Sequence, residues 1–182
     1  MTRAYLSLGS NVGDRLALLR AAVQRLRDVA DVELVTASPL YESEPWEEEP
    51  GRTGSEQRWY LNCVVAVDTP LPPRALLDRL HGIEDALGRV RPAGTPEARR
   101  FAPRTLDIDI LFYGEEVISG PDDLQVPHLL LAERAFVLRP LSDVAPDLEH
   151  PTLYATVREL LDTLADDHTV RPGGYSARWF EE

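Results

Sequence analysis

The chain contains no lysine. All 19 of its basic residues are arginine, in 182 residues whose formal net charge is −12. This absence excludes functions that need a lysine amine: a P-loop lysine, a Schiff-base lysine or the strand lysine of protein kinases. If the protein handles phosphate, arginine and metal ions must do so. The acidic balance argues against a general nucleic-acid binder, and we expect no nucleic-acid partner.

Cysteine and long apolar runs are scarce as well. The one cysteine, Cys63, excludes an internal disulfide and a cysteine-based zinc site, and its apolar surroundings favour an inert core thiol. No apolar run approaches the ~20 residues of a membrane helix, and no signal-peptide pattern opens the chain. We therefore expect a soluble cytoplasmic protein that makes no membrane contact. Its length suits one domain with a real core.

Hydrophobic spacing predicts alternating strands and helices. Period-two patterns with flanking turn residues predict four strands, over residues 3–8, 32–41, 59–67 and 104–113. Helical spacing predicts a helix capped by Asp14 and a second helix that begins at Pro72 and stops at Gly88. A short hairpin partner of the fourth strand is expected near Val117 and Ile118.

The C-terminal third is expected to be mainly helical. This region spans residues 127–164, with turns expected at Pro140, Pro146 and Pro151, and a loose tail is expected after Asp166. The strand and helix order matches the split βαβ pattern, so we predict an α+β fold. It is a ferredoxin-like antiparallel sheet with helices on both sides, an α/β/α sandwich. We expect a single domain over residues 1–165 and a C-terminal tail over 166–182.

Two aspartates interrupt an apolar strand in "RTLDIDIL". Because side chains alternate across a strand, Leu106, Ile108 and Ile110 should face the core, while Asp107 and Asp109 share the other face. Two carboxylates this close need neutralising, and Mg²⁺ with substrate phosphates would do so. The alternative is a sheet face on which arginines cover the acids, and D-x-D alone does not separate the two.

Arginines favour the metal interpretation. Arg104 lies three positions before Asp107, and Arg89, Arg91, Arg99 and Arg100 crowd the preceding loop. Acid pairs beside guanidinium groups suit metal-assisted phosphoryl transfer. That loop and the acidic loop 42–58 are long, which in compact domains usually indicates function or disorder.

Four stretches in order resemble one family, 6-hydroxymethyl-7,8-dihydropterin pyrophosphokinase of folate biosynthesis. They are "YLSLGSNVGDR", "WYLNCVVAV", "GRVR…RRFAPRTLDIDILFYG" and "VPHLLLAERAFVLRPLSDVAP". The resemblance spans about residues 4–151. It implies transfer of diphosphate from ATP, the co-substrate, to the pterin hydroxymethyl group, with release of AMP. Two Mg²⁺ ions and sequential binding, MgATP before pterin, are also implied, and we expect a monomer.

The resemblance also implies residue roles. Asp107 and Asp109 match the metal ligands, and the arginines that stabilise the transferring phosphates match Arg91, Arg100 and Arg104. The pterin site is matched by Ser43, Pro45, Tyr60, Asn62 and Phe136, and Trp46 is a candidate cap over that site. Two aromatic rings can sandwich a heterocycle whose polar edge pairs with an amide. The nucleotide site is matched by His81, Glu84, Phe101, Ile110, His128 and Arg134.

Several matches have a simpler reading or depart from the family pattern. Tyr60, Phe136 and Ile110 would equally suit core packing, and Glu84 could be a solvated helix charge. His81 and Phe101 replace the more usual Gln and Trp, and Leu129-Leu130 follows the histidine of "VPH" where another pair is usual. Two rival functions remain open: a D-x-D glycosyl or nucleotidyl transferase, and a non-catalytic ferredoxin-like binding module.

Overall fold

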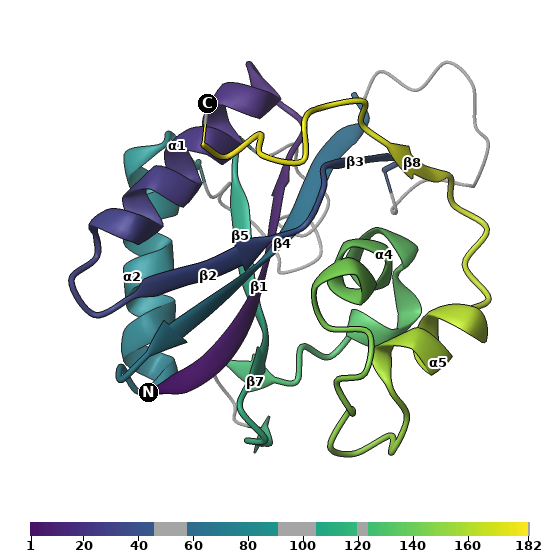
Figure 1. Ribbon diagram of the computed structural model, residues 1–182. Coiled ribbons are helices and arrows are strands. Elements are labelled where there is room, and N and C mark those ends of the chain that lie inside the picture. Colours follow the sequence, from purple (N-terminus) through teal and green to yellow (C-terminus); the bar gives the residue numbers. More distant parts are fainter. Residues whose placement is uncertain (46–57, 91–104, 120–123, 182) are drawn as a thin grey trace.

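A six-stranded sheet forms the centre of the molecule (Figure 1). The computed structural model describes residues 1–45, 58–90, 105–119 and 124–181. The strands are β1 (Thr2–Ser10), β2 (Glu33–Ala37), β3 (Tyr41–Ser43), β4 (Tyr60–Thr69), β5 (Asp107–Tyr113) and β8 (Val170–Pro172). They lie in the order β5-β1-β4-β3-β8, and β2 also pairs with β4. Every pairing in this sheet is antiparallel.

Helices cover both faces of the sheet. The helices α1 (Arg15–Asp28) and α2 (Pro73–Ala86) lie on one face, and α4 (Ala135–Val144) and α5 (Val157–Asp162) lie on the other (Figure 1). A 3-10 helix, η1 (Leu131–Glu133), precedes α4, and β6 (Ile118–Ser119) pairs with β7 (Gln125–Val126) outside the main sheet. The predicted α+β sandwich is confirmed. None of the helices in the described ranges is long and apolar enough to span a bilayer.

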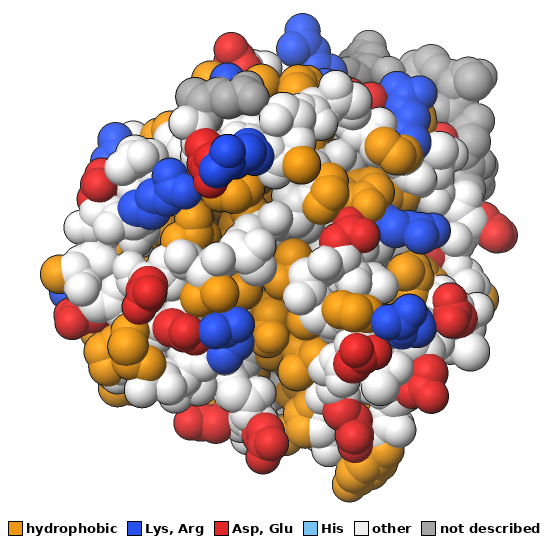
Figure 2. Space-filling view, in the orientation of Figure 1, with side chains coloured by type: hydrophobic (Ala, Val, Ile, Leu, Met, Phe, Trp, Pro, Cys, Tyr) orange, Lys and Arg blue, Asp and Glu red, His pale blue; other side chains and the backbone are white. Residues whose placement is uncertain are grey.

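Each face of the sheet has its own core. Leu6, Leu8 and Ile108 pack with helix residues such as Leu19 and Leu80 under α1 and α2. The other core lies under α4 and contains Val64, Phe112, Leu138 and Leu141. In Figure 2 apolar side chains run through the middle of the visible face, and charges of both signs are scattered around them. The two cores follow from period-two alternation along β1 and β4.

The predicted helix signals are confirmed locally. The Asp14 carboxylate accepts a hydrogen bond from the Ala17 N–H at 3.0 Å and so caps α1. Gly88 follows α2 with φ of +82°, a conformation that a residue with a Cβ adopts only at a cost. The start of α1 and the end of α2 therefore lie where the sequence predicts them.

The single strand predicted over 32–41 is wrong, because it is broken into β2 and β3. Ser38 lies at the break, and its hydroxyl accepts a hydrogen bond from the Val64 N–H at 3.0 Å. Pro39, which has no N–H to donate, follows it. Both strands still pair with β4.

The predicted hairpin is also wrong in its pairing. Ile118 pairs with Val126 of β7, not with β5. The outer edge of β5 already has other partners, since the Leu111 carbonyl accepts the His128 N–H at 3.0 Å and the Ile108 N–H donates to Glu84 at 2.8 Å. Backbone groups that are already bonded cannot template another strand.

The turn predicted at Pro140 is wrong as well, since Pro140 lies inside α4 and is buried. A proline within a helix loses one backbone hydrogen bond and costs about 3 kcal/mol. Three buried side chains of the same helix, Val137, Leu138 and Leu141, pack against the sheet. Their burial offsets that cost, so the helix continues through the proline.

The loose tail expected after Asp166 is instead part of the fold. Residues 170–172 form β8 and pair with β3. Trp179 is fully buried in the core with α1 and α2, and its indole N–H donates to the Ser38 carbonyl at 2.9 Å. Arg20 of α1 donates to the Trp179 carbonyl at 2.6 Å. The segment is ordered by contacts with residues more than a hundred positions away in sequence.

We predict that Trp179→Ala destabilises the whole domain. The substitution removes a large buried ring and its hydrogen bond, so the free energy of unfolding should fall by about 3–5 kcal/mol in chemical denaturation. Tyr175→Ala is the control, because Tyr175 is 41% exposed in the same segment, and it should cost under about 1 kcal/mol. Equal, small losses for both variants would show that the segment folds separately from the core.

Candidate active site

The two aspartates of β5 lie together on the face of the sheet opposite α1 and α2. Ile108 and Ile110 are 2% and 4% exposed and belong to the core under those helices. Asp107 and Asp109 alternate with them and are partly buried. Across β1, Asp107 is paired with Gly9 and Asp109 with Ser7. The alternation predicted for "LDIDI" is therefore confirmed.

Asp107 has an arginine partner. The Arg89 guanidinium lies 2.7 Å from Asp107 Oδ1 and also donates to the Leu106 carbonyl at 2.6 Å. One of the two interpretations of the D-x-D pattern is that arginines cover the acids. Arg89 does so for Asp107. It does not exclude a cation, because a carboxylate offers about four lone-pair sites on two oxygens.

The acid pair continues into a polar row across the sheet. In register, Asp107 lies beside Gly9, Gly9 beside Asn62, and Asn62 beside Tyr41. Gly9 is needed at this point, since a Cβ there would lie 2.9 Å from Asn62 Oδ1, closer than real contacts allow. No local pattern in the sequence indicates this close approach at Gly9. The glycine lets the Asn62 amide lie against β1.

Three of the predicted pterin residues meet at the end of this row. Asn62 Nδ2 donates to Ser43 Oγ at 2.8 Å, and both side chains are almost fully buried. Tyr60 is the register partner of Ser43 and is partly buried, and Pro45 is buried two residues further on. A buried amide held by a hydroxyl in this way has a fixed orientation.

The first turn of α4 supplies a second wall on the same face. The Arg134 guanidinium lies 5.6 Å from the centre of the Phe136 ring, and Phe136 is partly buried against the core under α4. Further along the helix, Asp143 accepts a hydrogen bond from the Tyr41 hydroxyl at 2.6 Å, which joins α4 to β3. Burial and the hydrogen bond to Asp143 raise the pKa of Tyr41 to about 12. Tyr41 therefore acts as a neutral donor.

The predicted nucleotide residues of α2 lie on the opposite face. Glu84 is 3% exposed, and its Oε1 accepts the Ile108 N–H at 2.8 Å. The reading of Glu84 as a solvated helix charge is therefore wrong, because the carboxylate holds the edge of β5. Ile110 is buried in the core, while His81 is partly exposed on the same helix.

His128 follows β7 and lies beside the outer edge of β5, where its backbone N–H donates to the Leu111 carbonyl. Its Nδ1 accepts the Leu130 N–H at 3.2 Å, so in the neutral ring the proton is carried by Nε2. A cavity of about 290 Å³ opens beside it, lined also by His150 and by Leu129, which is 72% exposed. Five other predicted site residues lie outside the described ranges: Trp46, Arg91, Arg100, Phe101 and Arg104.

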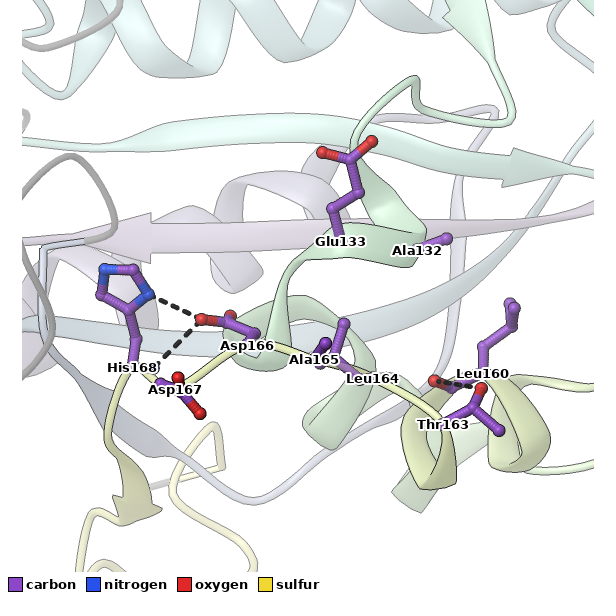
Figure 3. A pocket seen from close by; sticks show the side chains of 9 residues that line it. All are labelled: Ala132, Glu133, Leu160, Thr163, Leu164, Ala165, Asp166, Asp167 and His168. Carbon is purple, nitrogen blue, oxygen red and sulfur yellow. Dashed lines mark hydrogen bonds and ion pairs between the residues drawn. The ribbon is translucent and has the colours of Figure 1, made fainter.

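Asp166, which is not among the predicted site residues, supports the α4 wall. Its Oδ2 accepts the N–H of Ala135, the first residue of α4, at 2.9 Å. Its Oδ1 accepts from the His168 N–H and from His168 Nδ1, at 3.0 and 2.6 Å (Figure 3). A cavity of about 530 Å³ lies beside this pair. Only the fold brings Asp166 to a helix 31 residues earlier, so no local pattern indicates the contact.

Comparison with known proteins gives consistent results. The model of the family described as 7,8-dihydro-6-hydroxymethylpterin-pyrophosphokinase matches residues 5–146. Two proteins named 2-amino-4-hydroxy-6-hydroxymethyldihydropteridine pyrophosphokinase are similar over most of their length. The one from Methylorubrum extorquens is 45% identical, with 81% of this chain and 85% of that protein covered. The one from Haemophilus influenzae is 37% identical, with coverage of 94% and 98%.

Solved structures agree on the fold. A chain described as HPPK-DHPS in complex with substrates superimposes with a TM-score of 0.65 at 17% identity. The match covers 89% of this chain and 43% of that one. The present chain thus spans less than half of that solved chain, and at this identity the likeness shows the fold alone.

We predict that Glu84→Ala destabilises the protein in the absence of any ligand. The buried Ile108 N–H would lose the acceptor that lies 2.8 Å away, at a cost of about 1–3 kcal/mol in the free energy of unfolding. Asp78→Ala, which removes an exposed carboxylate from the same helix, should change stability by about 0.5 kcal/mol or less. An unchanged free energy of unfolding for Glu84→Ala would contradict the assignment of Glu84 as the residue that holds the edge of β5.

We also predict that Asp166 makes stability depend on acid pH. Burial favours the neutral acid, but the donors from Ala135 and His168 outweigh burial and hold the pKa of Asp166 below its ordinary value. A carboxyl whose pKa is lowered by folding stabilises above its unfolded pKa, near 3.9, and this contribution is lost as the pH falls through the folded pKa.

Asp166→Asn should therefore unfold with a weaker dependence on pH below about pH 4 than the wild type. Denaturant titrations at a series of pH values measure this dependence. Asp167→Asn, an exposed neighbour, is the control and should keep the wild-type profile. Parallel profiles for the wild type and Asp166→Asn would contradict the assignment.

Proposed function

The chain belongs to the 7,8-dihydro-6-hydroxymethylpterin-pyrophosphokinase family, and from this membership we propose its reaction. It transfers diphosphate from ATP to the hydroxymethyl group of 6-hydroxymethyl-7,8-dihydropterin and releases AMP, in folate biosynthesis. The observation that carries the proposal is the family match over residues 5–146, which includes both Asp107 and Asp109 and the Ser43, Tyr60 and Asn62 cluster. We propose a monomer that works in the cytoplasm.

The pterin is assigned to the end of the polar row. Asn62 can pair with the donor and acceptor edge of the ring system, and its hydrogen bond to Ser43 fixes which way the amide faces. Tyr60 and Phe136 lie on the same side of the sheet and offer aromatic faces for stacking. Pro45 and Trp46 are assigned to the loop beside the ring.

The phosphates are assigned to the β5 end of the row. Asp107 and Asp109 would hold Mg²⁺, for which we propose two ions, and the bound metal would neutralise charge on the transferring phosphates. Among the described residues no group of three or more His, Cys, Asp or Glu forms a closed metal site. Two carboxylates that leave positions for substrate phosphates suit magnesium.

Arginine supplies the remaining positive charge. Arg134 extends from the start of α4, on the face that carries the acid pair. We assign phosphate contacts to Arg91, Arg100 and Arg104, which precede β5 in sequence. Guanidinium groups match phosphate oxygens with paired hydrogen bonds, which a lysine-free chain needs. The other nucleotide contacts are assigned to His81, Glu84, Phe101, Ile110 and His128.

The chemical step depends mainly on how the two substrates are positioned relative to each other. The hydroxymethyl oxygen forms a bond to the β-phosphorus while the bond from that phosphorus to the oxygen bridging it to the α-phosphorus breaks. AMP leaves, and the hydroxyl proton passes to water. The polar row would hold the pterin toward one end and the phosphates toward the other. The hydroxymethyl oxygen would then be aligned with the β-phosphorus before the reaction begins. MgATP binds first and the pterin second.

We predict that the wild-type protein, incubated with ATP, Mg²⁺ and hydroxymethyl-dihydropterin, forms AMP and the pterin diphosphate. Asp109→Ala should lower kcat/KM by at least about 100-fold with the fold retained, and Asp107→Ala likewise. Asp109→Ala is the cleaner test, because Asp107→Ala also removes the partner of Arg89. Chromatography of the nucleotides and pterins provides the measurement, and circular dichroism checks the fold.

Glu33→Ala is the matched control, since it removes an exposed carboxylate from a strand of the same sheet, and it should keep wild-type activity. Near-normal turnover by Asp109→Ala would refute the metal assignment. Absence of AMP from the wild-type reaction would refute the function itself and would favour a D-x-D glycosyl or nucleotidyl transferase or a binding module.

A further inference from the structure

A short segment after α5 contacts both walls of the proposed pterin site. We call residues 166–171 the strap. At its first end Asp166 caps α4, whose first turn carries Arg134 and Phe136. At its second end β8 pairs with β3, which carries Ser43 (Figure 1). The strap lies beyond residues 5–146, the part of the chain that the family model matches.

The first end of the strap is rigid. The Asp166 carboxylate accepts three hydrogen bonds, one from Ala135 and two from His168, so the turn between 166 and 168 is fixed to the helix terminus. The side chains of Asp166 and His168 are only 4% and 12% exposed. A buried, charge-assisted cluster of this kind holds its geometry better than exposed pairs do.

The second end holds β3 by backbone and side chain. Glu44 N–H donates to the Thr169 carbonyl at 3.1 Å, and Thr169 N–H donates to Glu44 Oε2 at 2.8 Å. Arg171 Nη2 donates to Glu42 Oε2 at 2.8 Å. Ser43 lies between these two glutamates, so both neighbours of the proposed pterin residue are tied to the strap.

Glu42 is also held from α1. Arg15 Nη2 donates to Glu42 Oε1 at 2.9 Å, and Arg15 Nη1 donates to the Trp59 carbonyl at 2.7 Å. Above Trp59 the Arg171 guanidinium lies 4.5 Å from the ring centre. Burial would raise the pKa of Glu42, but the hydrogen bonds from Arg171 and Arg15 lower it further than burial raises it. Glu42 is therefore a charged link among α1, β8 and the residue before Tyr60.

Without β8, β3 would be a three-residue strand on the edge of the sheet. Such a strand has few hydrogen bonds to fix its register. A change in register would move Ser43 away from Asn62, whose amide depends on that hydroxyl for its orientation. The strap therefore controls the geometry of a site that it does not enter.

We propose that the strap is a positioning element for the pterin: Arg171, through Glu42, keeps Ser43 and Asn62 aligned and so sets pterin affinity without touching the substrate. The inference rests on the proposed pterin site. It assigns the role to Arg171, Glu42 and Thr169, none of which belongs to the site itself. The Arg171 and Glu42 side chains meet on the face of β3 opposite Ser43, because neighbouring residues of a strand alternate.

The test compares the effect of each substitution on the KM for the pterin with its effect on the KM for ATP. Arg171→Ala should raise the pterin KM roughly 3- to 10-fold and leave the ATP KM within about twofold, because only the β3 wall is released. Arg171→Lys keeps the charge and should restore part of the pterin affinity. Arg178→Ala is the matched control, since Arg178 lies in the same C-terminal segment and pairs only with the nearby surface residue Glu181 among the ion pairs described.

Thermal unfolding of each variant shows whether a loss is merely structural. The Arg171 side chain is 59% exposed, so Arg171→Ala should shift Tm by no more than about 4 °C. An equal rise in both KM values, or a rise matched by Arg178→Ala, would overturn the proposal. So would an unchanged pterin KM in Arg171→Ala when Asn62→Ala raises it.

Asn62→Ala, measured in the same assay, tests the premise separately. If Asn62→Ala leaves the pterin KM unchanged while the wild type is active, the site assignment fails and the strap proposal fails with it. If the wild type forms no pterin diphosphate, the proposed function fails first. A raised pterin KM in both Asn62→Ala and Arg171→Ala supports the site and the strap together.

Discussion

The hydrogen bond from the Ile108 N–H to the buried Glu84 carboxylate is the contact on which the candidate site depends. It fixes β5 at the edge of the sheet against α2, in a register that places Ile108 and Ile110 in the core. Alternation then leaves Asp107 and Asp109 no other face than the one opposite α1 and α2. A buried carboxylate is costly unless charge-assisted hydrogen bonds compensate it, so the strand and the glutamate constrain each other. Packing of β5 against α2 on one face of the sheet thus fixes the position of the two aspartates on the other face.

The remaining geometry comes from elements that are distant in sequence. Asn62 meets Ser43 across 19 residues, Ala135 meets Asp166 across 31, and Trp179 reaches Ser38 across 141. The first contact lies in the polar row, the second fixes the start of α4 beside it, and the third anchors the C-terminal segment in the core on the opposite face. The proposed sites for the two substrates thus share a surface built from β5, β1, β4, β3 and the start of α4.

Local signals in the sequence predicted the local structure well. The Asp14 cap, the glycine stop of α2 and the alternation in β5 are set by neighbouring residues, and the structure has all three. Long-range contacts decided the rest. Pro140 lies inside a helix because Leu138 and Leu141 pack on the sheet, and the supposed tail is ordered by Trp179. For the site, the structure places Ser43, Tyr60 and Asn62 beside one another, and their role in pterin binding stays a prediction. The capping role of Asp166 and the space at Gly9 need the fold. The roles of Arg91, Arg100 and Arg104 stay predictions.

Diphosphate transfer as proposed requires that Asp107 and Asp109 bind the cation that carries the nucleotide phosphates. A crystal structure of the protein with Mg²⁺ and a non-hydrolysable ATP analogue tests it most directly. Magnesium should lie within about 2.0–2.1 Å of oxygens from both carboxylates and from the phosphate chain. Phosphates bound with their magnesium away from β5, and with neither aspartate among the ligands, would contradict it.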